Sequence, residues 1–119
     1  MFQITPNRRY LATAVYNGIL VWNLQQPTED PGKLLTGHIH VAWVGSIRTL
    51  AFNPNARSGR LLASTGYDET LRLWDVGSGA LLRTFSDTRR DLFLLCFSGD
   101  GRYLAAYGYD GALRLFGIP

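Results

Sequence analysis

One short pattern occurs three times along the chain, and it limits the possible folds more than any other feature. Each copy places a tyrosine before an Asn or Asp and continues into an apolar run with a large aromatic residue. The copies read AVYNGILVWN (14–23), TGYDETLRLWD (65–75) and YGYDGALRLF (107–116). Trp22 and Trp74 are 52 residues apart, and Trp74 and Phe116 are 42 residues apart. An internal repeat of this length indicates an array of similar structural units.

The residues around the three copies favour short β-strands joined by turns. Aliphatic, β-branched and aromatic residues dominate each run, and Gly, Pro, Asn and Asp separate the runs. The apolar residues do not follow the period of an α-helix. We therefore expect an all-β protein with strands at 2–5, 10–15, 19–24, 33–36, 46–52, 61–65, 70–76, 80–85, 92–98, 103–108 and 113–118. Two segments, 25–33 and 39–45, account for the longer first spacing.

Composition excludes several classes of protein. With 46% hydrophobic and 18% charged residues, the chain should fold rather than stay disordered. No apolar run approaches the roughly 20 residues that cross a bilayer, so we expect no membrane partner. The first residues do not resemble a signal peptide, which favours a cytoplasmic location. The single cysteine, Cys96, lies in the apolar run LFLLCFS and is expected to be a small buried side chain.

The net charge of +3 is not in itself a sign of a nucleic-acid partner. A surface that follows a phosphate backbone needs clustered basic residues. The arginines are scattered along the chain, and the adjacent pairs are Arg8-Arg9 and Arg89-Arg90. We therefore do not expect nucleic acid to be the natural ligand.

The middle copy carries two dipeptides with an informative spacing in the sequence. Gly37-His38 is followed 36 residues later by Trp74-Asp75, with GYDETLRLWD near the end of that stretch. On these residues the chain resembles the WD40 repeat family of β-propellers over essentially its whole length, although the outer copies depart from the pattern at 21–23 (VWN) and 115–117 (LFG).

The resemblance implies a partial β-propeller of about three blades, each an antiparallel four-stranded sheet. The blades would cover 1–36, with a truncated first strand, then 37–85, and then 86–119, with the outer strand absent.

His38, Ser64 and Asp68 are the residue types of a Ser-His-Asp catalytic triad. The segment LASTG, however, offers no nucleophile elbow for Ser64. The resemblance implies instead that His38, Ser64, Asp68 and Trp74 form a buried structural tetrad, in which each polar group has a hydrogen-bond partner.

No other cluster indicates chemistry. His38 and His40 form an H-x-H pair, but a zinc site needs a further ligand that the sequence does not supply nearby. The chain also has no phosphate-binding loop and no dinucleotide fingerprint. We therefore expect no enzymatic activity, no metal and no cofactor.

The tyrosines of the three turns are the candidate binding residues. The resemblance implies that Tyr16, Tyr67 and Tyr109 face the rim of the central channel on one end of the propeller. Tyrosine offers a large, stiff area with a polar tip, which suits recognition. The alternative is plain inheritance, because duplication of one ancestral blade would repeat its tyrosine without selection for binding.

Three further residues join this candidate site. Arg48 and Phe93 occupy equivalent places near the start of a first strand, and Trp43 lies in the extra segment 39–45. Trp43 is either an anchor for a partner or a side chain that folds down onto the second blade.

The sequence therefore predicts a non-catalytic scaffold that binds a protein or peptide through the tyrosine-bearing end. Three blades do not close a ring, since closed propellers have at least four. Two alternatives follow. The chain is a structural module that self-associates to complete a ring, or it is the C-terminal, sensor part of a larger signalling protein whose remaining blades lie on the same chain.

Overall fold

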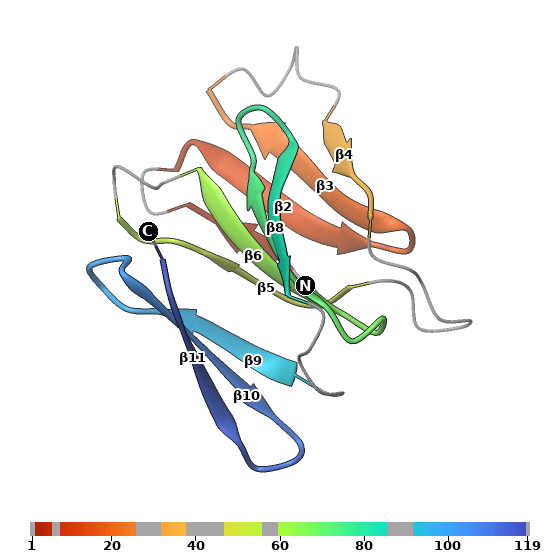
Figure 1. Ribbon diagram of the computed structural model, residues 1–119. Helices are drawn as coiled ribbons and strands as arrows, with labels where there is room; N and C mark the ends of the chain where they lie inside the picture. Colours follow the sequence, from red (N-terminus) through yellow and green to blue (C-terminus); the bar gives the residue numbers. More distant parts are fainter. Residues whose placement is uncertain are drawn as a thin grey trace.

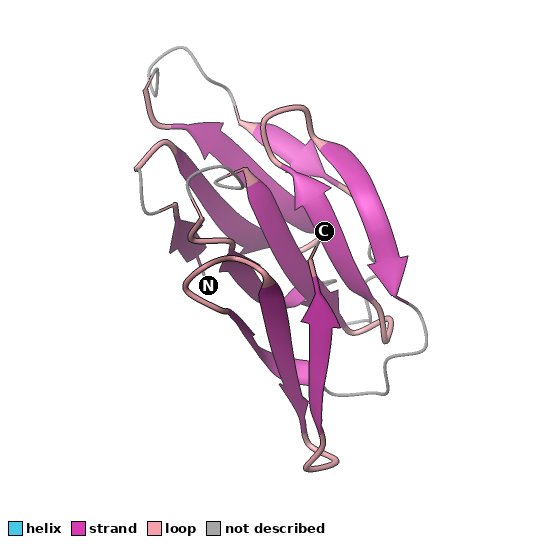
Figure 2. Ribbon diagram, turned by 60° about the vertical axis from the view of Figure 1, so that its left-hand side comes forward, coloured by secondary structure: helices cyan, strands magenta, loops and turns pink. Residues whose placement is uncertain are grey.

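A computed structural model describes residues 2–5, 8–25, 32–37, 47–55, 60–85 and 92–118. In these residues the chain forms strands and turns and no helix, which confirms the all-β prediction (Figure 2). The strands are β1 (Phe2–Ile4), β2 (Tyr10–Val15), β3 (Gly18–Asn23), β4 (Lys33–Leu35), β5 (Ile47–Phe52), β6 (Leu61–Gly66), β7 (Leu71–Asp75), β8 (Ala80–Phe85), β9 (Leu92–Phe97), β10 (Tyr103–Gly108) and β11 (Leu113–Gly117). Each predicted strand end lies within one residue of the observed end.

The strands form three antiparallel sheets in chain order. The first sheet is β1-β2-β3-β4, the second is β5-β6-β7-β8, and the third is β9-β10-β11. Figure 1 shows them following one another as a fan, and β5 contacts both β1 and β9, so the first strands of the three sheets are neighbours. The arrangement is that of consecutive propeller blades that do not close into a ring, as predicted.

Two apolar clusters hold the fan together. The first lies between the first and second sheets, and the second between the second and third sheets. The strands of the second sheet supply both clusters because neighbouring residues of a strand point to opposite faces. Leu62 packs in the first cluster, and the next residue, Ala63, packs in the second. The three inner strands of the second sheet, β5, β6 and β7, are therefore covered on both faces, whereas its outer strand β8 is exposed along most of its length.

The outer faces of the first and third sheets carry exposed apolar residues. On the first sheet these are Phe2, Ile4 and Leu34, and on the third sheet they are Leu94, Tyr103, Tyr107, Leu113 and Leu115. No described residue of another sheet packs on either face.

The prediction that Cys96 is buried was wrong. Cys96 is exposed, because in the β9–β10 pairing it stands opposite Ala105, on the outer face of the third sheet. An apolar run in a strand supplies residues to both faces, and here one of the faces is open.

Candidate functional site

The turns after β6 and after β10 have the same backbone geometry. In the first, the Glu69 amide donates to the Gly66 carbonyl oxygen (3.4 Å) and the Gly66 amide donates to Thr70 (3.2 Å). In the second, Gly111 donates to Gly108 (3.1 Å) and Gly108 donates to Ala112 (3.4 Å). Three-residue hairpin turns of this kind place their third residue in the left-handed region.

That third residue is Glu69 (φ 67°) in one turn and Gly111 (φ 77°) in the other. Tyr67 and Tyr109 are the first residues of these turns. The turn of the first sheet is shorter: Val15 pairs directly with Gly18, which leaves Tyr16 and Asn17 as the turn. Figure 1 shows the three turns along one side of the fan. We call this side the tyrosine-bearing end.

An aspartate follows the tyrosine in both longer turns and fixes the loop. Asp68 Oδ1 accepts hydrogen bonds from the Thr70 amide (3.2 Å) and the Thr70 hydroxyl (2.7 Å), and Asp110 Oδ1 accepts one from the Ala112 amide (3.0 Å). Such side-chain bonds to a backbone amide two residues ahead stabilise turns.

Each aspartate also faces an arginine four residues later. Arg72 Nη2 lies 4.0 Å from Asp68 Oδ2, and Arg114 Nη2 lies 3.2 Å from Asp110 Oδ2. Our sequence interpretation missed these pairs. The signal was present, because YDETLR and YDGALR both have an arginine four residues after the aspartate.

Arg48 brings two of the predicted tyrosines together. The residue lies on β5, and its guanidinium carbon Cζ is 5.0 Å from the ring centroid of Tyr67 and 5.1 Å from that of Tyr109. Both distances lie in the range of cation–π attraction. Tyr67 belongs to the second sheet and Tyr109 to the third, so the contact joins neighbouring sheets at the tyrosine-bearing end. We call these three residues the arginine–tyrosine cluster.

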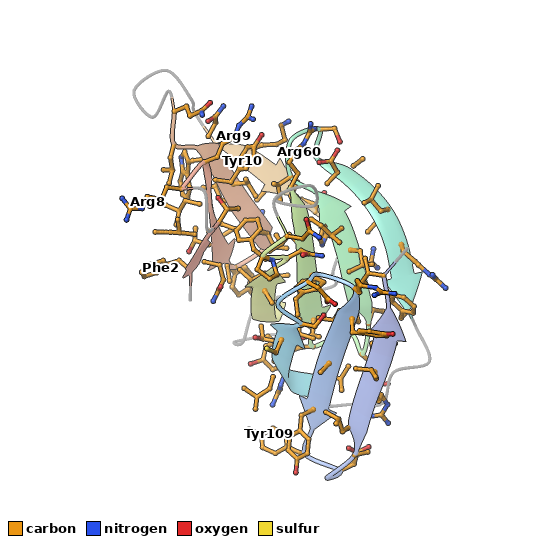
Figure 3. All side chains as sticks on the ribbon, turned by 90° about the vertical axis from the view of Figure 1, so that its left-hand side faces the viewer. Phe2, Arg8, Arg9, Tyr10, Arg60 and Tyr109 are labelled. Atoms are coloured by element: carbon orange, nitrogen blue, oxygen red, sulfur yellow. The ribbon has the colours of Figure 1, made fainter. Side chains whose placement is uncertain are left out.

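The cluster combines burial with exposure. Arg48 is partly buried, and its Nε is buried without a hydrogen-bond partner in the described part of the chain. Tyr67 is partly buried, whereas 67% of the surface of Tyr109 is exposed. Figure 3 shows Tyr109 projecting at one extremity of the molecule, far from Arg60 at the other. Most of the Tyr109 surface is therefore accessible to another molecule.

The remaining predicted binding residues lie elsewhere or outside the described residues. Tyr16 is 57% exposed on the turn of the first sheet. Phe93 lies in β9, but its side chain is not among those described, and Trp43 and the whole segment 39–45 are outside the described residues. Arg48, Tyr67 and Tyr109 are the predicted residues that the structure brings into contact.

The predicted tetrad is described in part. The Trp74 indole Nε1 donates to the Ser64 hydroxyl oxygen over 2.8 Å, and both residues are buried. His38 lies outside the described residues, but Gly37 is described. A Cβ on Gly37 would stand 2.9 Å from Arg72 Nη1, the end of a flexible side chain, and 3.3 Å from the Trp74 ring; the positive φ of Gly37 (154°) is what favours glycine there. Ser64 has no exposed surface, and a substrate could not reach its hydroxyl.

Two further features of the described molecule bear on chemical reactivity, namely a hollow and the placement of possible metal ligands. A hollow of about 190 Å³ between the second and third sheets is lined by Leu61, Leu73, Leu82, Arg83, Gly117 and Ile118, without a carboxylate or a nucleophile. Among the described residues no three His, Cys, Asp or Glu side chains gather as metal ligands would. In the same residues, no helix has the length and apolar character needed to span a membrane.

Comparison with known proteins agrees with the architecture. The family model "WD domain, G-beta repeat" (WD40) matches residues 30–75 and 79–116. Each matched stretch contains the outer strand of one sheet and the three strands of the next, from β4 to β7 and from β8 to β11. One sequence repeat therefore spans two sheets, which ties neighbouring blades together.

Relatives with WD repeats include coronin-7 of Bos taurus, 38% identical over 78 residues, which cover 66% of this chain and 8% of coronin-7. The F-box-like/WD repeat-containing protein TBL1X of Mus musculus is 41% identical over 49 residues, which cover 41% of this chain and 9% of the relative. The cross-pathway control WD-repeat protein 2 of Flammulina velutipes is 34% identical over 70 residues, which cover 56% of this chain and 20% of the relative. The chain thus spans only a small part of these proteins, and its two repeats and three blade-like sheets show that it belongs to the WD40 repeat family.

Proposed function

We propose that the chain is a non-catalytic interaction scaffold that binds a protein or peptide through its tyrosine-bearing end. The observation that carries this proposal is the arginine–tyrosine cluster, in which residues from two sheets meet at an exposed end of the molecule. Tyrosine and arginine are the residue types that most often anchor interfaces. Membership of a family of repeat proteins that offer extended surfaces agrees with this role.

The cluster favours a binding role over plain inheritance of the tyrosine. A tyrosine copied without a role need not meet a partner from another sheet. Here Tyr109 of the third sheet and Tyr67 of the second approach the same guanidinium, although Tyr109 keeps most of its surface exposed. This shared contact supports a role for the two rings in one binding surface.

A peptide selection tests the proposal. Peptides enriched from a random displayed library on the immobilised chain would be measured by fluorescence anisotropy against wild type and variants. Tyr109→Ala should weaken binding by about tenfold or more, since a well-placed aromatic contributes at least about 1.4 kcal/mol. Tyr103→Ala is the matched control, because Tyr103 is an exposed tyrosine at the opposite end of β10. Equal losses in both variants, or no enriched peptide, would refute binding at this end.

A specific observation favours a second function, that of a module that joins other blades. The outer faces of the first and third sheets expose Phe2, Ile4, Leu113 and Leu115, and large exposed apolar areas mark interaction surfaces. The blades that would cover them come from a second copy of the chain or from a longer chain. Under this function Tyr109→Ala does little, whereas Leu115→Lys abolishes assembly, as light scattering behind size-exclusion chromatography would show.

A further inference from the structure

Three arginines of the second and third sheets have described contacts at the tyrosine-bearing end, and their charges are balanced differently. Arg72 faces Asp68, and Arg114 faces Asp110. Arg48 contacts two rings instead, and no carboxylate of the described residues lies against it. The cluster therefore presents a cation whose countercharge is not supplied by the described part of the chain.

The hydrogen bonding of Arg48 shows the same deficit. Its Nε–H is buried and has no acceptor among the described residues, which is costly for a charged donor. Aromatic rings attract the guanidinium through its π-face but accept no in-plane hydrogen bond. Because Nε is covered, an incoming carboxylate would meet the terminal Nη groups, which point outward in the guanidinium plane and can donate two parallel hydrogen bonds. Such an acceptor is the group that the cluster lacks.

The rings also restrict the side chain before any ligand arrives. Arg48 is held by contacts near 5 Å with Tyr67 and Tyr109, from two different sheets. An arginine that is already ordered loses less conformational entropy on binding. The exposed ring of Tyr109 adds apolar area for the carbon atoms of the incoming side chain.

We propose that the arginine–tyrosine cluster binds the carboxylate of an Asp or Glu side chain in the partner's segment. This inference rests on the proposed function, because it names the chemistry that the tyrosine-bearing end recognises.

A single carboxylate fits the local charges better than a nucleic acid does. A phosphate backbone needs several unpaired cations in a row. Here the neighbouring Arg72 and Arg114 are already paired, and their partners Asp68 and Asp110 each follow a cluster tyrosine directly in sequence. Arg72 and Arg114 are therefore already engaged and not available to a polyanion, whereas one carboxylate needs only Arg48.

The test uses short peptides with blocked ends and a central Glu between randomised positions, arrayed beside the same peptides with central Gln. The 119-residue chain should bind the best Glu peptides about tenfold or more tightly than their Gln counterparts, since hydrogen bonds between charged groups are the strong ones. This comparison uses wild-type protein and so does not depend on a variant that folds.

Variants of the chain show which residue causes the preference for Glu over Gln peptides. Arg48→Gln should remove the Glu-over-Gln preference, and Arg48→Lys should reduce it, because lysine keeps the charge but loses the planar fork. Arg83→Gln is the matched control: it removes the same charge from an arginine that stacks on Phe85 at 4.5 Å, in β8, and it should leave the preference intact. The circular dichroism of each variant is compared with that of wild type.

The outcomes separate the two proposals. Peptides that bind through Tyr109 with no Glu-over-Gln preference, or with a preference that survives Arg48→Gln, would overturn the carboxylate site and leave the scaffold standing. No peptide binding at all would overturn both. A single-stranded DNA oligonucleotide that bound more tightly than the Glu peptides and depended on Arg48 would also overturn the carboxylate proposal in favour of phosphate.

Discussion

The second and third sheets carry nearly the same sequence in different surroundings. Leu71 and Leu73 of TLRLW are 0% and 5% exposed, whereas their counterparts Leu113 and Leu115 of ALRLF are 68% and 65% exposed. Both strands are the third strand of a sheet and have the same alternation. The difference comes from the neighbour: the third sheet covers the second, and no described sheet covers the third. In a repeat protein the environment of a residue is thus set by the adjoining repeat.

Replacing the matched leucines should give the largest difference in stability between the two sheets. Leu71→Ala should lower the free energy of unfolding by about 2–5 kcal/mol, because it opens a cavity in a core shared by two sheets. Leu113→Ala should change it by no more than about 0.5 kcal/mol. Urea denaturation measures both. A large loss for Leu113→Ala would mean that the outer face is covered in solution.

The buried hydrogen bond of the second sheet has no counterpart in the third. Ser64→Ala should cost about 1–3 kcal/mol, because the buried Trp74 indole N–H loses its acceptor. In the third sheet, Ala106 and Phe116 replace the pair, so neither hydroxyl nor indole is present. Ala106→Ser, which adds a hydroxyl beside phenylalanine instead of an indole, is the control and should not stabilise. Thermal denaturation of the two variants decides, and a neutral Ser64→Ala would contradict this account.

The turns that contain Glu69 and Gly111 should give a smaller difference in stability between the two sheets. Glu69 holds a left-handed backbone that Gly111 adopts without strain. Glu69→Gly should therefore stabilise the chain by up to about 1 kcal/mol, and Gly111→Ala should destabilise it by a similar amount. Chemical denaturation measures both variants, and changes of the same sign would show that the turns are not equivalent.

The last residue of β7 is an aspartate, Asp75, and the last residue of β11 is a glycine, so the two strand ends should respond differently to acid. Burial of Asp75 opposes its ionisation, but hydrogen bonds from Ser78 and Gly77 and the charge of Arg60 outweigh burial and hold the pKa below 3.8. Gly117 takes the equivalent place in the third sheet and has no such group. A lowered folded-state pKa stabilises the chain above the usual value, and this stability is lost as the pH falls through the folded value.

Asp75→Asn should therefore lower stability slightly at neutral pH, by up to about 1 kcal/mol for an exposed pair, and flatten the loss below pH 3.8. Melting temperatures measured across this pH range test it. Unchanged acid sensitivity in Asp75→Asn would assign the loss to other carboxyl groups, such as Asp100, whose pKa is lowered by hydrogen bonds from Ser98 and Arg102.

Local features of the fold could be predicted from sequence, and features between sheets could not. The strands and the turn positions of Tyr67 and Tyr109 follow from residue preferences over short stretches. The exposure of Cys96 was mispredicted, because an apolar run does not tell which of its two faces a neighbour covers. The contact of Arg48 with Tyr109 depends on how two sheets pack, and no spacing within one repeat encodes it.

The most direct test of the scaffold is amide hydrogen exchange with and without a selected peptide. Our account predicts slower exchange on binding in the turns around 66–70 and 108–112, and unchanged exchange in the turn around 98–102 at the other end of the third sheet. Protection confined to β1 or β11, on the outer faces, would contradict it and favour the blade-joining function.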